Sequence, residues 1–291
     1  MFVVGKGGVG KTTVAAALAL SHARLGRRVL LARIARVGQE AALGGDESVT
    51  SLTGVITSTV DGEVELDEYL DRIMPSAVAR RVVRSSIYRH FVAAAPGLRE
   101  LMAVGRVAAE ERGEAGRPWD AVVVDCPATG HGIEYLGMPA AAAAAFGAGL
   151  VRREAEQVQR AIGDPGRCAV VPVTTAEEMP VNEVIELVAR LRALELPLGP
   201  MFVNKVHASP LAVGEPPPAP DEASPIVAAV LQCAHEETGW AHLGERELAR
   251  LARAVPGPRV LLPYLYAPLL GEREIGVLVD AIAAQLAAVG G

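Results

Sequence analysis

The feature that most constrains the fold is a glycine-rich string near the N-terminus, Gly5-Lys6-Gly7-Gly8-Val9-Gly10-Lys11-Thr12-Thr13. A short apolar run at 2–4 precedes it, and apolar residues at helical spacing follow it, so the expected context is strand, loop and helix. Glycines let backbone N–H groups close around an anion, and the start of a helix adds partial positive charge. The string matches GxxxxGK[ST] and predicts a loop that binds phosphates. The plain alternative is a glycine-rich turn without a ligand.

Within this loop the residue types predict distinct roles. Lys11 is expected to reach the β- and γ-phosphates, and the Thr12 hydroxyl is expected to bind Mg²⁺. A carboxylate for the metal's outer shell is expected at the end of a buried strand, and Asp125 directly follows the apolar run 121–124. The alternative for Asp125 is a residue that caps a turn. The remaining loop residues predicted to bind the nucleotide are Gly7, Gly8, Val9, Gly10 and Thr13.

The rest of the chain alternates short apolar runs with amphipathic stretches. Strands are expected at 29–32, 55–60, 121–124, 169–171, 201–203 and 260–262. Helices are expected at 140–162, at 177–194 and from about 272, with two more after residue 225. The alternation predicts an α/β fold with a doubly wound, mostly parallel sheet of the P-loop NTPase type. We expect a single domain over 1–291, with an arginine-rich helical insertion at about 67–117 and a Pro-rich loop at 207–225.

Lysine is scarce in this sequence and its positions are informative. There are only three lysines among 28 basic residues, namely Lys6, Lys11 and Lys205. A lysine ammonium is a compact point charge that fits inside a loop, whereas a guanidinium is planar and wider. Two of the three lie in the glycine-rich string, and Lys205 follows the strand expected at 201–203. We therefore treat all three as candidate site residues.

Charge and composition exclude several classes of function. The net charge of −6 disfavours nonspecific nucleic-acid binding, because that needs a basic face. Three cysteines make neither a disulfide framework nor a CxxC zinc site, which is typical of a reducing cytoplasm. The longest uncharged apolar stretch, 136–151, is shorter than a bilayer span, so stable membrane insertion is not expected. No signal peptide is expected before the loop, and the short first strand is consistent with a native start upstream of Met1.

Two motifs together resemble the ArsA/guided-entry ATPase family. The first is the deviant loop, with Lys6 directly after its first glycine, and the second is Asp125-Cys126-Pro127-Ala128-Thr129-Gly130-His131. The family's switch II segment typically reads Asp-Thr-Ala-Pro-Thr-Gly-His, so the Pro and Ala are transposed here. Asn204 resembles the family's strand-end asparagine, which contacts adenine. Pro263 resembles the start of the family's loop on the adenine side. The arrangement looks closest to the bacterial ArsA-like branch.

The resemblance implies a dimeric switch that binds ATP or ADP with Mg²⁺ and hydrolyses ATP. Lys6 would act on the partner's nucleotide, with Lys11 and Asp125 in the catalytic machinery, and Gly130 would contact the γ-phosphate. Thr12 and Asp125 would hold the metal. The partner would be a second copy or a paralogous ATPase, and a protein client would bind at the helical insertion, within Ala77–Ala95. An ordinary amphipathic helix that packs on its own core is the alternative for that segment.

One departure from the family opens further alternatives. The family carries an Asp-Pro pair just after the second strand, where the Asp orients the attacking water, but residues 32–40 contain no aspartate. Either Gln39 or Glu40 takes this role, or the chain is a weakly hydrolysing or non-hydrolysing regulatory subunit that pairs with a catalytic paralogue. A ParA/MinD-like positioning ATPase is a second alternative, although residues 281–291 contain no lysine or arginine. Cys126 is interpreted as a small buried hydrophobic residue.

Overall fold

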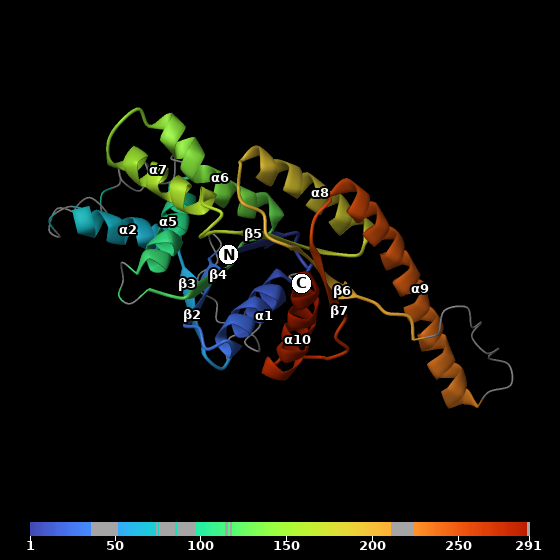
Figure 1. Ribbon diagram of the computed structural model, residues 1–291. Coiled ribbons are helices and arrows are strands. Elements are labelled where there is room, and N and C mark those ends of the chain that lie inside the picture. The colour runs from blue at the N-terminus through green and yellow to red at the C-terminus, as the bar shows by residue number, and fades with distance from the viewer. Residues whose placement is uncertain are drawn as a thin grey trace.

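A computed structural model describes residues 1–35, 52–73, 75, 85, 97–113, 116, 118–210 and 224–289. Within these residues seven strands form one sheet in the order β3-β2-β4-β1-β5-β6-β7, and every pair of neighbours is parallel (Figure 1). The strands are β1 (Phe2–Gly5), β2 (Val29–Ile34), β3 (Val55–Val60), β4 (Ala121–Asp125), β5 (Val170–Thr175), β6 (Met201–Val206) and β7 (Arg259–Pro263). The predicted doubly wound parallel α/β fold is confirmed.

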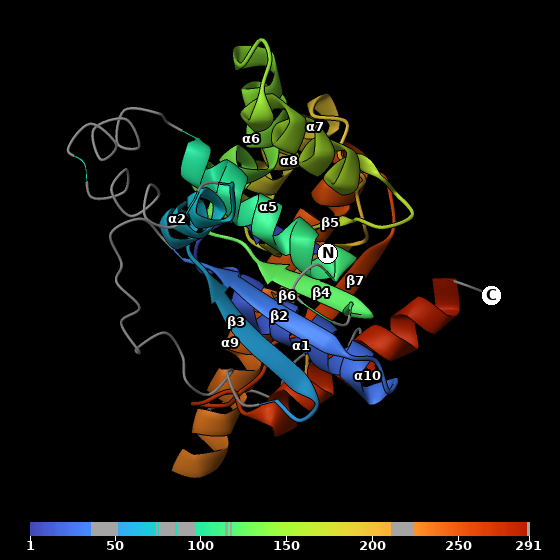
Figure 2. The ribbon, with the colours of Figure 1, turned by 90° about the vertical axis from the view of Figure 1, so that its left-hand side faces the viewer.

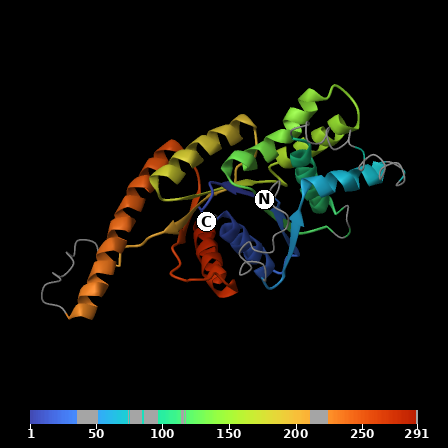
Figure 3. The ribbon, with the colours of Figure 1, turned by 180° about the vertical axis from the view of Figure 1, so that it is seen from behind.

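Helices cover both faces of this sheet, as Figures 1 and 3 show from opposite sides. On one face α1 and α10 bury one apolar cluster, and on the other α5, α6 and α8 bury a second. Outside the second layer, α7 packs against α5 and α6, and α2 lies along α5 (Figure 2). The helices are α1 (Lys11–Arg24), α2 (Gly62–Ile73), α5 (Leu98–Arg112), α6 (Thr129–Ala145), α7 (Leu150–Gly163), α8 (Glu178–Ala193), α9 (Pro225–Ala254) and α10 (Glu272–Val289).

The strand order determines where a site can form. β1 lies in the middle of the sheet, between β4 and β5, and it is buried along its whole length. From β1 the chain first builds β2 and β3 on one side and later β5, β6 and β7 on the other. The carboxyl end of β1 is therefore a switch point, where the connections leave a crevice that open α/β sheets use for ligands. The glycine-rich loop begins in this crevice, at Gly5.

Two helix predictions are wrong in detail. The helix expected at 140–162 is two helices, because α6 starts at Thr129 and ends at Ala145, before a break that contains Gly149 at φ 108°. The two helices expected after the Pro-rich loop are one helix of 30 residues, α9. α9 runs unbroken through Gly239 and Gly244, although glycine has a poor helix propensity. Gly244 is buried, and an added Cβ there would lie 3.4 Å from the Cβ of Ala176, in the segment between β5 and α8.

Part of the expected insertion lies outside the described residues. α2 and α5 fall within or beside 67–117, and α5 buries Val104 and Val107 against the sheet. Except for residue 85, the segment 77–95 that carries the predicted client surface lies outside the described part, as do residues 211–223 of the Pro-rich loop. The insertion as a unit stays a prediction. No helix in the described part of the chain is long and apolar enough to cross a bilayer.

Candidate nucleotide site

The glycine-rich loop wraps the N-terminus of α1 at the carboxyl end of β1. Gly10 precedes the helix with φ 87°, a left-handed conformation that glycine adopts without a side-chain clash. No side chain in the described part of the chain caps this helix end, so its first N–H groups point into the loop. Lys11 is buried, and its ammonium donates to the Lys6 carbonyl oxygen at 2.9 Å. This is an anion-binding geometry with a lysine folded back along it.

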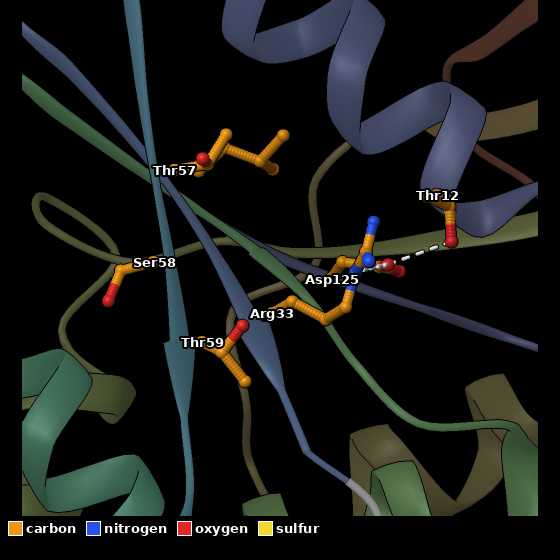
Figure 4. Close-up of a pocket in the computed structure, with 7 residues that line it drawn as sticks. Thr12, Arg33, Thr57, Ser58, Thr59 and Asp125 are labelled. Carbon is orange, nitrogen blue, oxygen red and sulfur yellow. Dashed lines mark hydrogen bonds and ion pairs between the residues drawn. The ribbon is translucent and has the colours of Figure 1, made fainter. Parts of the chain in front are cut away.

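A threonine and an aspartate meet at the end of the loop where the metal is predicted to bind. The Thr12 hydroxyl donates to Asp125 Oδ2 at 2.7 Å, and Asp125 is only 7% exposed (Figure 4). Asp125 ends β4, the strand next to β1, so the sheet brings it to the loop. One hydroxyl and one buried carboxylate are hard oxygen donors of the kind that Mg²⁺ takes alongside substrate phosphates. The chemistry of these two residues therefore fits the predicted metal.

The end of β6 contacts the same loop from the other side. Asn204 is buried, and its amide Nδ2 donates to the Val9 carbonyl oxygen at 3.0 Å. Lys205 has a left-handed φ of 55°, and its ammonium donates to the Gly8 carbonyl oxygen at 3.0 Å. Both residues brace the loop backbone in this structure. All three lysines of the sequence, Lys6, Lys11 and Lys205, thus lie on or against the loop.

Lys6 has a partner that the sequence did not indicate. Its ammonium lies 2.5 Å from Glu183 Oε1 on α8, and both side chains are about one-third exposed. The pair joins the loop to the helix layer above β5. In this arrangement Lys6 points within its own chain.

The predicted base-side residues lie at the ends of the two last strands in the sheet. Val206 of β6 pairs with Pro263 of β7, and the N–H of Tyr264 donates to the Val206 carbonyl oxygen at 2.9 Å. The Tyr264 ring stacks on His207 with 4.6 Å between the ring centroids. The two rings form an aromatic pair directly after the ends of β6 and β7. The sequence did not indicate this pair because His207 and Tyr264 are far apart along the chain.

The other predicted residues fall at the same end of the sheet. Val9 is a buried residue of the loop, and an added Cβ on Gly7 would lie 3.8 Å from the Cβ of Ala128, three residues after Asp125. Thr13 lies in the first turn of α1. Gly130 lies in the first turn of α6, which follows β4 directly. The structure thus places these residues within the loop, in the first turn of α1, or in the helix that follows β4.

An arginine at the end of β2 stands close to the site. β2 ends with Arg33 and Ile34, while Gln39 and Glu40 lie outside the described residues. Arg33 Nε lies 3.7 Å from Asp125 Oδ2. The sequence did not single out Arg33, because its contact with Asp125 depends on the pairing of β2 with β4. No local sequence pattern predicts that pairing.

Cys126 follows Asp125 and is buried, at 3% exposed, as its interpretation as a small hydrophobic residue requires. Burial, with a further contribution from the Asp125 carboxylate, raises the pKa of the Cys126 thiol far above its ordinary value.

The described residues include no group of three or more His, Cys, Asp or Glu side chains arranged to hold a metal ion.

The parallel sheet and the glycine-rich loop on α1 define a P-loop nucleoside triphosphatase fold, and the Thr12–Asp125 pair lies at the predicted phosphate site. The family model described as "Anion-transporting ATPase" matches residues 1–153, more than half of the chain. This chain therefore belongs to the ArsA-type anion-transporting ATPase family. Both motifs on which the resemblance rested lie inside the matched region.

Individual relatives agree with this membership. ATPase BagA of Mycobacterium tuberculosis is 32% identical over 220 residues, which are 70% of this chain and 64% of that protein. The arsenical pump-driving ATPase of Escherichia coli is 26% identical over 235 residues, 71% of this chain and 39% of the relative. ATPase GET3 of Rhodotorula glutinis is 29% identical over 154 residues, 50% of this chain and 42% of the relative. This chain thus spans less than two thirds of the length of these relatives.

Proposed function

We propose that this chain is a nucleotide-driven switch that binds Mg-ATP in the glycine-rich loop and hydrolyses it. The observation that carries the proposal is the meeting of Lys11, Thr12 and Asp125 at the uncapped start of α1. Backbone N–H groups, a lysine and a metal-binding oxygen pair are what phosphoryl transfer requires of a protein. The names of the relatives, each of them an ATPase, support the same class.

Each residue of the site has a proposed role. Lys11 turns from the Lys6 carbonyl to the β- and γ-phosphates, while Thr12 and Asp125 hold Mg²⁺, which neutralises phosphate charge when bound. Val9 and Asn204 keep the loop in shape, and the loop glycines with Thr13 present N–H groups to the phosphates. Further nucleotide contacts are proposed for Gly7, Gly8, Gly10, Gly130, Lys205 and Pro263.

We further propose that the working form is a dimer. Lys6 then leaves Glu183 and reaches the nucleotide of the partner, which is a second copy or a paralogous ATPase. A cation supplied in trans to developing phosphate charge raises phosphoryl-transfer rates by roughly 10³–10⁵ in related systems. A protein client at the helical insertion and a cytoplasmic location complete the proposal. Free Cys126, Cys168 and Cys233 are typical of a reducing compartment.

A second candidate function is a nucleotide-binding regulatory subunit with little turnover. The sequence at and after the end of β2 favours it, because residues 32–40 contain no aspartate to orient an attacking water. Such a chain would bind Mg-ATP in the same loop and pair with a catalytic paralogue. The two candidates share the binding site and differ only in hydrolysis.

Mg-ATP turnover by the purified chain, with Lys11→Ala as the blank, separates these candidates. Turnover above the blank supports the switch ATPase and shows that another group replaces the missing aspartate. No turnover together with ATP-dependent thermal stabilisation supports the regulatory subunit. Stabilisation of about 2.7 kcal/mol is expected at a hundredfold excess of nucleotide over its Kd. If Lys11→Ala binds ATP as tightly as the wild type, the proposed site is wrong.

A further inference from the structure

Arg33 shares one carboxylate oxygen with the residue that is proposed to bind the metal. β2 and β4 run in parallel with Arg33 opposite Asp125 in register, so the guanidinium reaches across to the carboxylate. Its Nε lies 3.7 Å from Asp125 Oδ2, the same oxygen that accepts the Thr12 hydroxyl at 2.7 Å. Figure 4 shows the three side chains converging. A permanent positive charge therefore stands where a metal ion would need negative charge.

A small cavity beside this cluster offers the arginine a second position. Its volume is about 130 Å³, and Thr57, Ser58 and Thr59 of the edge strand β3 line it along with the cluster. Thr59 is the register partner of Arg33 in the neighbouring strand. Side chains two residues apart on a strand share a face, so Thr57 and Thr59 both border the cavity on the side of Arg33 (Figure 4). Threonine hydroxyls accept hydrogen bonds from a guanidinium. The Arg33 side chain is 36% exposed, so it can turn without repacking the core.

We propose that Arg33 is a built-in counter-cation, which pairs with Asp125 when Mg²⁺ is absent and turns to the Thr57 and Thr59 hydroxyls when Mg-nucleotide binds. The inference rests on the proposed function, because it assumes that Thr12 and Asp125 hold the metal. A guanidinium keeps its charge at every accessible pH, so it cannot yield by losing a proton. Two cations at one carboxylate oxygen repel each other strongly at this range. Metal binding here is therefore a cation exchange, and Arg33 sets the Mg²⁺ concentration that the site requires.

The test is the Mg²⁺ dependence of ADP binding, measured by isothermal titration calorimetry with EDTA or with increasing MgCl₂. Arg33→Gln removes the positive charge. It is expected to lower the MgCl₂ concentration that gives half of the maximal increase in ADP affinity by roughly three- to tenfold. ADP affinity in EDTA is expected to stay within about twofold of the wild type. Arg33→Lys keeps the charge and is expected to stay close to the wild type. Arg24→Gln removes an arginine that pairs with Asp280 outside the site, and it serves as the matched control.

For a second variant, Thr59→Val, we expect the MgCl₂ requirement to shift in the opposite direction. Thr59→Val removes one of the two acceptors in the alternative position, which shifts Arg33 toward Asp125, and the MgCl₂ requirement is expected to rise by about two- to fivefold. In the Arg33→Gln background Thr59→Val is expected to change nothing, because no guanidinium remains to be accepted. A thermal melt of each variant verifies folding before the titrations.

The outcomes distinguish this inference from the function on which it rests. An unchanged or higher MgCl₂ requirement in Arg33→Gln overturns the counter-cation role, and so does a large loss of ADP affinity in EDTA, which would make Arg33 a nucleotide contact. A Thr59→Val shift that persists without Arg33 also overturns it. If the wild type itself binds no ADP at any MgCl₂ concentration, the proposed function fails as well.

Discussion

Lys6 in the glycine-rich loop and Glu183 on α8 form an ion pair at 2.5 Å that holds the loop lysine against its own chain. The lysine that is proposed to act on a partner's nucleotide is thereby neutralised within its own subunit. Closing a dimer would exchange this carboxylate for phosphate oxygens. The strength of the pair then contributes to the balance between separate and paired subunits.

Glu183→Gln is predicted to favour the paired state. Removing the carboxylate releases Lys6 for the partner, and the half-maximal rate of Mg-ATP hydrolysis is expected at a roughly two- to fivefold lower protein concentration. The measurement is turnover against protein concentration. Glu186→Gln, on an exposed position of the same helix, is the control. A concentration dependence identical in all three proteins would argue that Lys6 does not act in trans.

Asn204→Leu is predicted to destabilise the loop and the fold together. The substitution leaves the Val9 carbonyl oxygen without its donor in a buried place, which costs about 1–3 kcal/mol of unfolding free energy. Urea denaturation measures the loss. Lys205→Gln changes an exposed contact to Gly8 and is expected to cost less than about 1 kcal/mol. Equal losses in the two variants would contradict the bracing role assigned to Asn204.

The sequence predicted the parts of this site that local patterns determine. The loop, Lys11 and Thr12 belong to one contiguous motif, and Asp125 ends an apolar run that can only be a buried strand. Parallel strands bring such strand ends to one edge, so these residues were expected together. The Asn204 position was suggested by family resemblance, but its amide contacts the loop backbone here.

The contacts that the sequence could not predict depend on tertiary neighbours. Arg33 meets Asp125 only because β4 inserts between β1 and β2, and Glu183 meets Lys6 only because α8 packs above β5. Helix limits were also wrong. Glycine is a weak helix former, yet α9 runs unbroken through both Gly239 and Gly244.

Two glycines of the loop make a matched pair for testing its shape. Gly8 and Gly10 share a φ of 87°, but only at Gly10 does an added Cβ meet a neighbour, 2.2 Å from Asn204 Nδ2. Gly8→Ala is therefore expected to cost about 1–2 kcal/mol of unfolding free energy from backbone conformation alone. Gly10→Ala is expected to cost about 1–3 kcal/mol more, because Asn204 must move. Chemical denaturation of both variants checks the difference, and a difference near zero would show that the loop yields freely.

Thiol reactivity is predicted to separate the three cysteines. Cys126 and Cys168 are buried, whereas Cys233 is exposed on α9. Burial raises the pKa of the Cys126 and Cys168 thiols, so neither offers a reactive thiolate near neutral pH. A chromogenic disulfide reagent at pH 8 should label one thiol per native chain quickly and three after unfolding. Cys233→Ala should abolish the fast phase, and fast labelling that survives this change would place a reactive thiolate elsewhere.

The buried thiol of Cys126 is also predicted to lower the free energy of unfolding at alkaline pH. Burial, the largest cause, raises the pKa of Cys126 in the folded chain well above its ordinary value of 9.0, which we assign to the unfolded chain. Below pH 9 the thiol is protonated in both states and its contribution to stability is fully present. Above pH 9 the unfolded chain releases this proton and the folded chain does not, so stability falls as pH rises. By pH 10 the loss from this thiol is on the order of 1 kcal/mol.

The check is urea denaturation between pH 7 and pH 10 for the wild type and for Cys126→Ala. The alanine variant starts less stable, because it leaves a small cavity beside β4, but it should lose less stability than the wild type over this pH range, by on the order of 1 kcal/mol. Cys233→Ala removes an exposed thiol and should follow the wild-type pH dependence. Parallel pH profiles for Cys126→Ala and the wild type would mean that the folded chain ionises this thiol as readily as the unfolded chain does. In that case the segment after Asp125 would open to solvent in the native state, and Cys126 would be a reactive thiol in the site.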